Sequence, residues 1–270
     1  MWIQPSYFGA LVYALLAPIL FNQVPSQTTE SRRILKGAMV SLSWAVVFFL
    51  LFQSSERQGP SIFTWIGIQI SILIYAGVMT ISALTLVLYS GPILQLVMFD
   101  GPEYEYDLSS LNSYLFTPIF EELIYRSCII TGLLASGWSL FATVFVSAFI
   151  YAAVPFYNLR KASQEKGTAK AEAIKNVLVQ TGYTILVGFY TGYCYMITGN
   201  LYASILVRSF TNFMERPSFA FLNPENPLCK RRKLLLVVHL LGVLSFLGLG
   251  YFMLDPKLLN SWHYQLTRKK

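Results

Sequence analysis

Charged side chains are scarce in this sequence. They make up 12% of its 270 residues, about half of the roughly 25% that is usual in soluble proteins. Apolar residues make up 55%, and the mean hydropathy is +0.53. This balance excludes a disordered protein, a nucleic-acid-binding domain and an ordinary soluble enzyme. It predicts an all-α protein that crosses a membrane several times.

Histidine and cysteine are also few. His239 and His263 are the only histidines, and Cys128, Cys194 and Cys229 are the only cysteines. Their number and spacing match neither a disulfide framework nor a zinc site. The sequence contains no His-Glu-x-x-His motif, no phosphate-binding loop and no nucleotide fingerprint. We therefore expect neither a metal nor a cofactor.

Long apolar runs divide the chain into candidate membrane helices. A spanning helix needs about 20 mostly apolar residues, and the candidates are 7–24, 34–53, 62–90, 111–135, 138–157, 174–197, 200–214 and 233–254. Gly91-Pro92 is expected to break the third, and the short seventh carries Arg208. The predicted fold is thus about eight helices around a polar cleft. We divide it into N-terminal membrane helices (1–110), a helical core (111–254) and a basic C-terminal tail (255–270).

The distribution of Lys and Arg predicts the orientation. Most of them lie in loops on one side of the predicted bundle, including residues 158–175 and the run Lys230-Arg231-Arg232-Lys233. Cytoplasmic loops are enriched in such residues, so the N-terminus is expected to face away from the cytoplasm. If the seventh segment only re-enters the membrane, the basic run and the C-terminus exchange sides. The side of the C-terminus therefore stays open.

Three charges fall inside the fourth apolar segment. A charge at the bilayer centre costs at least about 2.5–3.5 kcal/mol, so Glu121, Glu122 and Arg126 should face a cavity lined by protein. Glu122 and Arg126 are four residues apart and can form an ion pair. Glu121 lies about 100° around the helix, without a partner on that helix, and is suited to act as a general base. The residues alone leave three interpretations open: a structural polar cluster, a catalytic site, or a proton or ion pathway.

The Glu-Glu-x-x-x-Arg run that follows Thr117-Pro118 resembles the type II CaaX prenyl endopeptidases. These are the Ras-converting-enzyme type, within a wider family of bacteriocin-processing and abortive-infection membrane proteases. The resemblance implies a glutamate-type intramembrane peptidase of the endoplasmic reticulum. It would remove the last three residues of isoprenylated CaaX proteins, such as small GTPases, and its other partner would be membrane lipid.

Two further family motifs are incomplete here. Phe149 begins a Phe-x-x-x-His pattern, but Ala153 stands where the histidine should be. Asn212 ends a His-x-x-x-Asn pattern, in which Arg208 replaces the histidine. By the resemblance, Glu121 would activate water together with the first histidine, and the second would stabilise the oxyanion with Asn212.

By the same resemblance, Glu122 and Arg126 would organise the site. Loss of an acid or base group lowers the rate by about 10²–10⁴-fold. Arg208 could polarise a carbonyl, or it could pair with Glu121 and stop it acting as a base; we favour the ion pair. His239 is expected to pack between helices, with replacement of a lost histidine as the alternative.

Three hypotheses for the function follow, two from the resemblance and one from the charged residues alone. The first is a CaaX prenyl endopeptidase, and the second is an impaired pseudo-protease that still binds prenylated tails. The third is a proton or solute transporter built on Glu121 and Glu122. Ionisable residues are nearly absent from the other predicted helices, which counts against a transporter because a relay needs several.

Overall fold

The structure, a computed structural model, describes residues 61–69, 72–98, 107–162, 168–255 and 261–268, with Leu259 and scattered positions between 31 and 42. The elements in this part of the chain are all helices, with no strand, which confirms the all-α class. The predicted span at 7–24 lies outside the described residues, as does most of the span at 34–53.

The two glutamates lie on one long helix from Leu108 to Ala135, which joins α6 (Leu108–Leu111), α7 (Thr117–Glu122) and α8 (Thr131–Ala135). Wider, π-helical stretches connect them at Asn112–Phe116 and Leu123–Ile130. The first of these precedes Pro118, which has no N–H and whose ring crowds the carbonyl four residues before it. Such π-helical stretches are frequent at functional sites.

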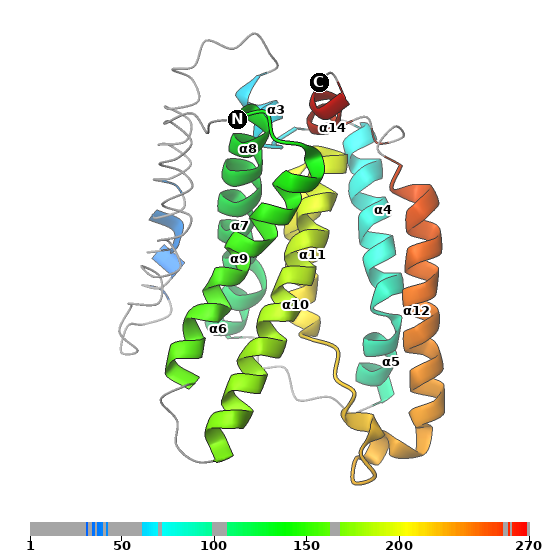
Figure 1. Cartoon of the computed structure of the whole chain (residues 1–270). Coiled ribbons are helices and arrows are strands. Elements are labelled where there is room, and N and C mark those ends of the chain that lie inside the picture. The colour runs from blue at the N-terminus through cyan, green and yellow to red at the C-terminus, as the bar shows by residue number, and fades with distance from the viewer. Residues whose placement is uncertain are drawn as a thin grey trace.

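Three more helices surround this long helix. They are α9 (Leu140–Ala162), α10 (Thr168–Thr198) and α11 (Leu201–Met214); α9 and α10 pack against each other along much of their length (Figure 1). A tight turn separates α10 from α11. Gly199 has a φ of 64° there, and the Asn200 side chain accepts a hydrogen bond from the Tyr202 N–H at 2.7 Å. Asn200 thereby caps α11.

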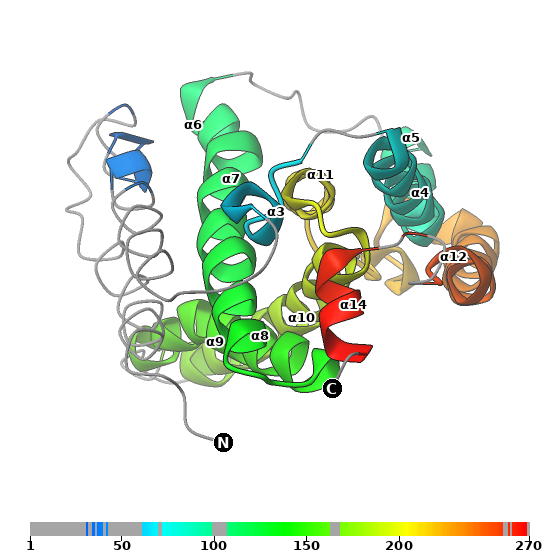
Figure 2. The ribbon, with the colours of Figure 1, turned by 90° about the horizontal axis from the view of Figure 1, so that it is seen from above.

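The remaining long helices form a second group, seen from above in Figure 2. They are α4 (Ile72–Leu88), α5 (Ser90–Met98) and α12 (Arg232–Met253), which packs on both α4 and α5. The predicted break of this segment is present, but it lies at Tyr89, just before Gly91-Pro92. The chain bends by 59° just before Ser90, and proline is tolerated in the first turn of the new helix. A Cβ on Gly91 would overlap the His239 ring of α12, so glycine permits this close packing.

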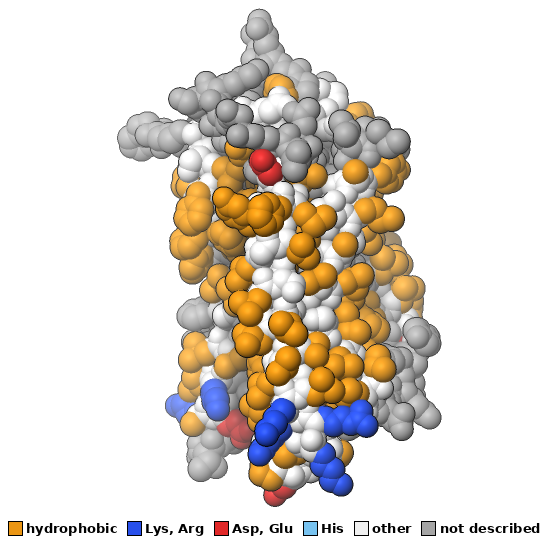
Figure 3. Space-filling view, turned by 90° about the vertical axis from the view of Figure 1, so that its right-hand side faces the viewer, with side chains coloured by type: hydrophobic (Ala, Val, Ile, Leu, Met, Phe, Trp, Pro, Cys, Tyr) orange, Lys and Arg blue, Asp and Glu red, His pale blue; other side chains and the backbone are white. Residues whose placement is uncertain are grey.

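One helix of the described residues, Pro227–Met253, is long and apolar enough to cross a membrane. Its mean hydropathy is 2.2, and only 11% of its most apolar stretch is buried. The bent pair of helices Tyr75–Leu88 and Ser90–Met98 is a second candidate span if the two helices cross the membrane as one unit. Figure 3 shows apolar side chains covering this side of the molecule. The count of eight spans stays a prediction.

The end of the bundle that carries the C-terminus is joined by one backbone carbonyl. The carbonyl of Trp65, at the end of α3 (Ile62–Trp65), accepts hydrogen bonds from three helices. The donors are the Thr131 hydroxyl, the Tyr195 hydroxyl and His263 Nε2 of α14 (Trp262–Arg268), each at 2.9 Å. These bonds connect α3, α8, α10 and α14 at one end of the bundle.

The basic residues lie at the other end. Helix α11, the predicted seventh segment, begins at the end of the bundle that carries α14, and after it ends the chain continues to the opposite end (Figure 1). The chain thereby brings the exposed run Lys230–Lys233 to the end where α10 begins with the exposed Lys170 and Lys175. Basic side chains accordingly gather at the base of α12 (Figure 3). The basic run therefore lies at the same end as the start of α10, which is the arrangement predicted for a fully crossing seventh segment; the side of the membrane stays a prediction.

Candidate active site

A fully buried ion pair lies at the centre of the first helix group. Arg126 Nε donates to Glu122 Oε2 at 3.0 Å, and both side chains are 0% exposed. The rest of the guanidinium is also satisfied, by the Ser147 hydroxyl of α9 at 2.9 Å and the Thr191 hydroxyl of α10 at 2.7 Å. The predicted i, i+4 pair is therefore present, and it connects three helices.

Glu121 has its partners on other helices. Its Oε2 accepts a hydrogen bond from the Tyr151 hydroxyl of α9 at 2.8 Å and one from Arg208 Nε of α11 at 3.2 Å. The Glu121 side chain is 24% exposed and that of Arg208 is 12% exposed. The ion pair favoured from the sequence is thus present.

The ring of Tyr151 connects the two ion pairs. The guanidinium carbon of Arg208 lies 4.8 Å from the ring centroid and that of Arg126 lies 5.6 Å from it. Tyr125 packs edge-on against the same ring, with centroids 4.9 Å apart. Two carboxylates and two guanidinium groups balance each other here. A neutral and hydrogen-bonded cluster is the arrangement in which an apolar bundle tolerates such charges.

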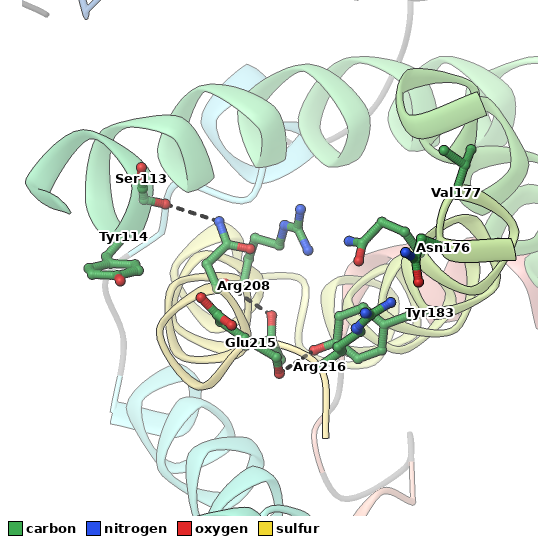
Figure 4. A pocket seen from close by; sticks show the side chains of 11 residues that line it. Ser113, Tyr114, Asn176, Val177, Tyr183, Arg208, Glu215 and Arg216 are labelled. Atoms are coloured by element: carbon green, nitrogen blue, oxygen red, sulfur yellow. Dashed lines mark hydrogen bonds between the residues drawn. The ribbon is translucent and has the colours of Figure 1, made fainter. Parts of the chain in front are cut away.

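A polar cleft of about 680 Å³ opens beside this cluster. Arg208 and Asn212 of α11 line it, together with residues of the long first helix and α10 (Figure 4). The Asn212 side-chain amide donates to the Ser113 carbonyl at 3.0 Å. Asn212 therefore lies in the same cleft as Arg208 but contacts the first helix rather than Glu121.

The residues of the predicted Phe-x-x-x-His motif lie partly outside the charged cluster around Glu121. Phe149 is 48% exposed and packs beside Phe145 on the outside of α9. Tyr151, two residues later, is the α9 residue that reaches Glu121. Ala153 is half-buried and lies two residues beyond Tyr151, on another face of the helix. Sequence reasoning missed Tyr151, because an aromatic residue in an apolar helix gives no signal of its own in so aromatic a chain.

Neither histidine lies with Glu121. His239 packs on α5, with its Nδ1 2.8 Å from the Leu235 carbonyl and its ring against those of Phe219 and Phe221. His263 binds the Trp65 carbonyl at the far end. The expectation that His239 packs between helices is confirmed.

The cluster is rich in donors and poor in groups that transfer protons. The guanidinium groups of Arg126 and Arg208 can donate hydrogen bonds but cannot accept them, and the Tyr151 hydroxyl already donates to Glu121. Glu121 is therefore the partly exposed group of the cluster that could accept a proton from water, and its Oε2 already accepts a hydrogen bond from Arg208. Among the described residues, no three His, Cys, Asp or Glu side chains are grouped closely enough to hold a metal ion.

The segment that carries this cluster matches a known family. Residues 107–214 match the model described as type II CAAX prenyl endopeptidase Rce1-like. By this match, the segment is similar to the type II CAAX prenyl endopeptidases. It includes every predicted site residue and Tyr151, whereas α4, α5, α12 and both histidines lie outside it.

Curated relatives that match part of the chain carry a similar name. The chain is 27% identical over 221 residues to "CAAX prenyl protease 2" of Homo sapiens, across 76% of this chain and 65% of the relative. It is 27% identical over 111 residues to "CAAX prenyl protease 2" of Arabidopsis thaliana, across 41% and 36%. For "Probable CAAX prenyl protease 2" of Schizosaccharomyces pombe, the identity is 29% over 130 residues, across 48% and 46%. The chain thus spans less than two thirds of the length of each relative, and no solved structure matches it.

Proposed function

We propose that this protein binds the C-terminal segments of isoprenylated CaaX proteins, such as small GTPases, in the endoplasmic reticulum membrane and hydrolyses them poorly or not at all. The observation that carries the proposal is the state of Glu121, which is bound by Tyr151 and Arg208. A general base has to be free to take a proton from water within hydrogen-bond distance. In this site the Oε2 atom of Glu121 already accepts hydrogen bonds from both Tyr151 and Arg208.

The loss of both family histidines supports the same conclusion. Arg208 can donate a hydrogen bond to a substrate carbonyl, but it cannot accept and return a proton. We further propose that Tyr151, rather than Phe149, occupies the aromatic position of the Phe-x-x-x-His motif. The fourth residue after Tyr151 is Pro155, which is likewise no histidine. In either alignment of the motif, the histidine that would act together with Glu121 is missing.

Slow endopeptidase activity is the second candidate. It is favoured by the partial exposure of Glu121, at 24%, and of Arg208, at 12%. A substrate carbonyl that enters from the cleft could take the Arg208 hydrogen bond and leave Glu121 free. In this case Arg208 and Asn212 would hold the oxyanion, as the resemblance implies.

Peptide binding tests the proposed function. The protein would be placed in nanodiscs, and the affinity for a fluorescent farnesylated CaaX peptide would be compared with that for the same peptide without the lipid. Val177 lines the cleft, whereas its neighbour Leu178 is 53% exposed and does not. We expect Val177→Trp to weaken binding of the farnesylated peptide at least 10-fold and Leu178→Trp to leave it unchanged. Binding no greater than that to empty nanodiscs would refute the proposal.

A further inference from the structure

The cleft beside the cluster suits a polar peptide end better than a lipid chain. Of the described residues that line it, only Val177 is aliphatic, and most carry amide, hydroxyl or charged groups. Asn176 and Gln180 of α10 line the space with side-chain amides, and Figure 4 shows that of Asn176. Amides of this kind can donate to and accept from a peptide backbone.

One cation in the cleft has no carboxylate partner. The ion pairs among the described residues are Glu122–Arg126 and Glu121–Arg208, so Arg216 takes part in neither. Arg216 is exposed and extends from the end of α11 toward α10 (Figure 4). Glu215 also lines the cleft, but no ion pair joins its carboxylate to Arg216.

The backbone before Arg216 is held in an unusual conformation. Glu215 has a φ of 56°, the one positive φ among the described residues other than glycine. Non-glycine residues rarely adopt this region, and surrounding contacts have to maintain it. The Tyr183 hydroxyl donates to the Glu215 carbonyl at 3.1 Å and lies 2.7 Å from the Tyr89 hydroxyl. These bonds fix the direction in which the chain leaves α11 and keep Arg216 at the cleft.

We propose that Arg216 binds the free C-terminal carboxylate of the peptide that occupies this cleft. A guanidinium pairs with a carboxylate through two parallel hydrogen bonds, which makes arginine suited to recognising a chain end. The inference rests on the proposed function, because a CaaX tail ends in such a carboxylate. Arg216 would then be a specificity residue that distinguishes a true C-terminus from an internal segment.

The spacing along α11 fits this role. The helix rises by about 9 Å from Arg208 to Met214, at 1.5 Å per residue, and two further residues lead to Arg216. Three extended peptide residues span about 10 Å. A tail whose carboxylate lies at Arg216 would therefore place the bond three residues before its end near Arg208 and Glu121.

The test compares a peptide acid with its amide. Full-length protein in nanodiscs would be titrated with a farnesylated CaaX peptide that ends either in a carboxylate or in a carboxamide. We expect the wild type to bind the acid at least 10-fold more tightly, since hydrogen bonds to a charged group are the stronger ones. Arg216→Ala should reduce affinity for the acid to that for the amide, and Arg216→Lys should recover part of the difference. Arg232→Ala, an exposed cation outside the cleft, should change neither.

The outcomes separate the two proposals. Equal affinity of the wild type for acid and amide would overturn the role of Arg216 and leave the proposed function intact. An equal loss for both peptides in Arg216→Ala would also overturn it, because that result indicates a structural effect. Binding of neither peptide by the wild type would instead refute the proposed function.

Discussion

The two adjacent glutamates should differ sharply in what their charges contribute to stability. Glu122 and Arg126 are both 0% exposed. Removal of one partner of a buried pair typically costs about 3–5 kcal/mol, because the other charge is left uncompensated. Glu122→Gln keeps the shape of the side chain and removes only its charge, so we expect a loss of this size.

Glu121→Gln should be much milder. Its pair with Arg208 is partly exposed, at 24% and 12%, and exposed pairs contribute about 0–1 kcal/mol. A glutamine can still accept the Tyr151 hydrogen bond through its side-chain oxygen. At roughly 2–4 °C per kcal/mol, Glu122→Gln should lower the Tm by about 6–20 °C and Glu121→Gln by about 4 °C or less.

Buried thiols provide the assay. Cys128 and Cys194 are buried, and Cys229 is half-buried, so a Cys229→Ser background leaves thiols that react with a maleimide dye only on unfolding. The double change Glu122→Leu with Arg126→Met should regain most of the loss, since it leaves no unpaired charge. Equal Tm values for Glu121→Gln and Glu122→Gln would refute the reasoning.

Three other predictions concern the register of the first motif, pH and orientation. Combined with Arg208→His, Pro155→His should raise peptide cleavage 10-fold or more and Ala153→His should not; a gain from Ala153→His alone would contradict the proposed register. Burial lowers the pKa of His263 from 6.5 to about 4, so its neutral form stabilises the fold above pH 6.5, and about 3 kcal/mol should be lost as the pH falls toward 4. Thermal unfolding from pH 7 to 4 should show this loss, whereas His263→Gln should flatten it. Finally, Cys229 should react with a membrane-impermeant maleimide in sealed microsomes, with Cys229→Ser as control; labelling only after permeabilisation would place the basic end in the lumen.

The sequence was most informative where spacing within one helix decides the contact. Glu122 and Arg126 are one helical turn apart, so their ion pair followed from the i, i+4 relation and is present at 3.0 Å. The all-α class followed equally from the apolar composition. These features need no knowledge of how the helices are arranged.

Contacts between helices were harder to predict. Tyr151 is one of 17 tyrosines, and only the packing of α9 against the first helix brings its hydroxyl to Glu121. The course of the chain at Gly91-Pro92 depended on α12, because the glycine makes room for His239 and the proline fits the first turn of α5. Spacing within one helix therefore located the charged cluster but could not identify Tyr151 as a hydrogen-bond partner of Glu121.

The central claim, that Glu121 is held by Arg208 and Tyr151 in a site that binds but does not efficiently cleave, is tested most directly by peptide hydrolysis. Purified wild type and Glu121→Ala would be reconstituted in liposomes with a farnesylated CaaX peptide, and release of the C-terminal tripeptide would be measured beside peptide binding. We predict that the peptide binds and that any tripeptide release is slow and equal in the two proteins. Rapid release by the wild type that is abolished in Glu121→Ala would contradict the claim.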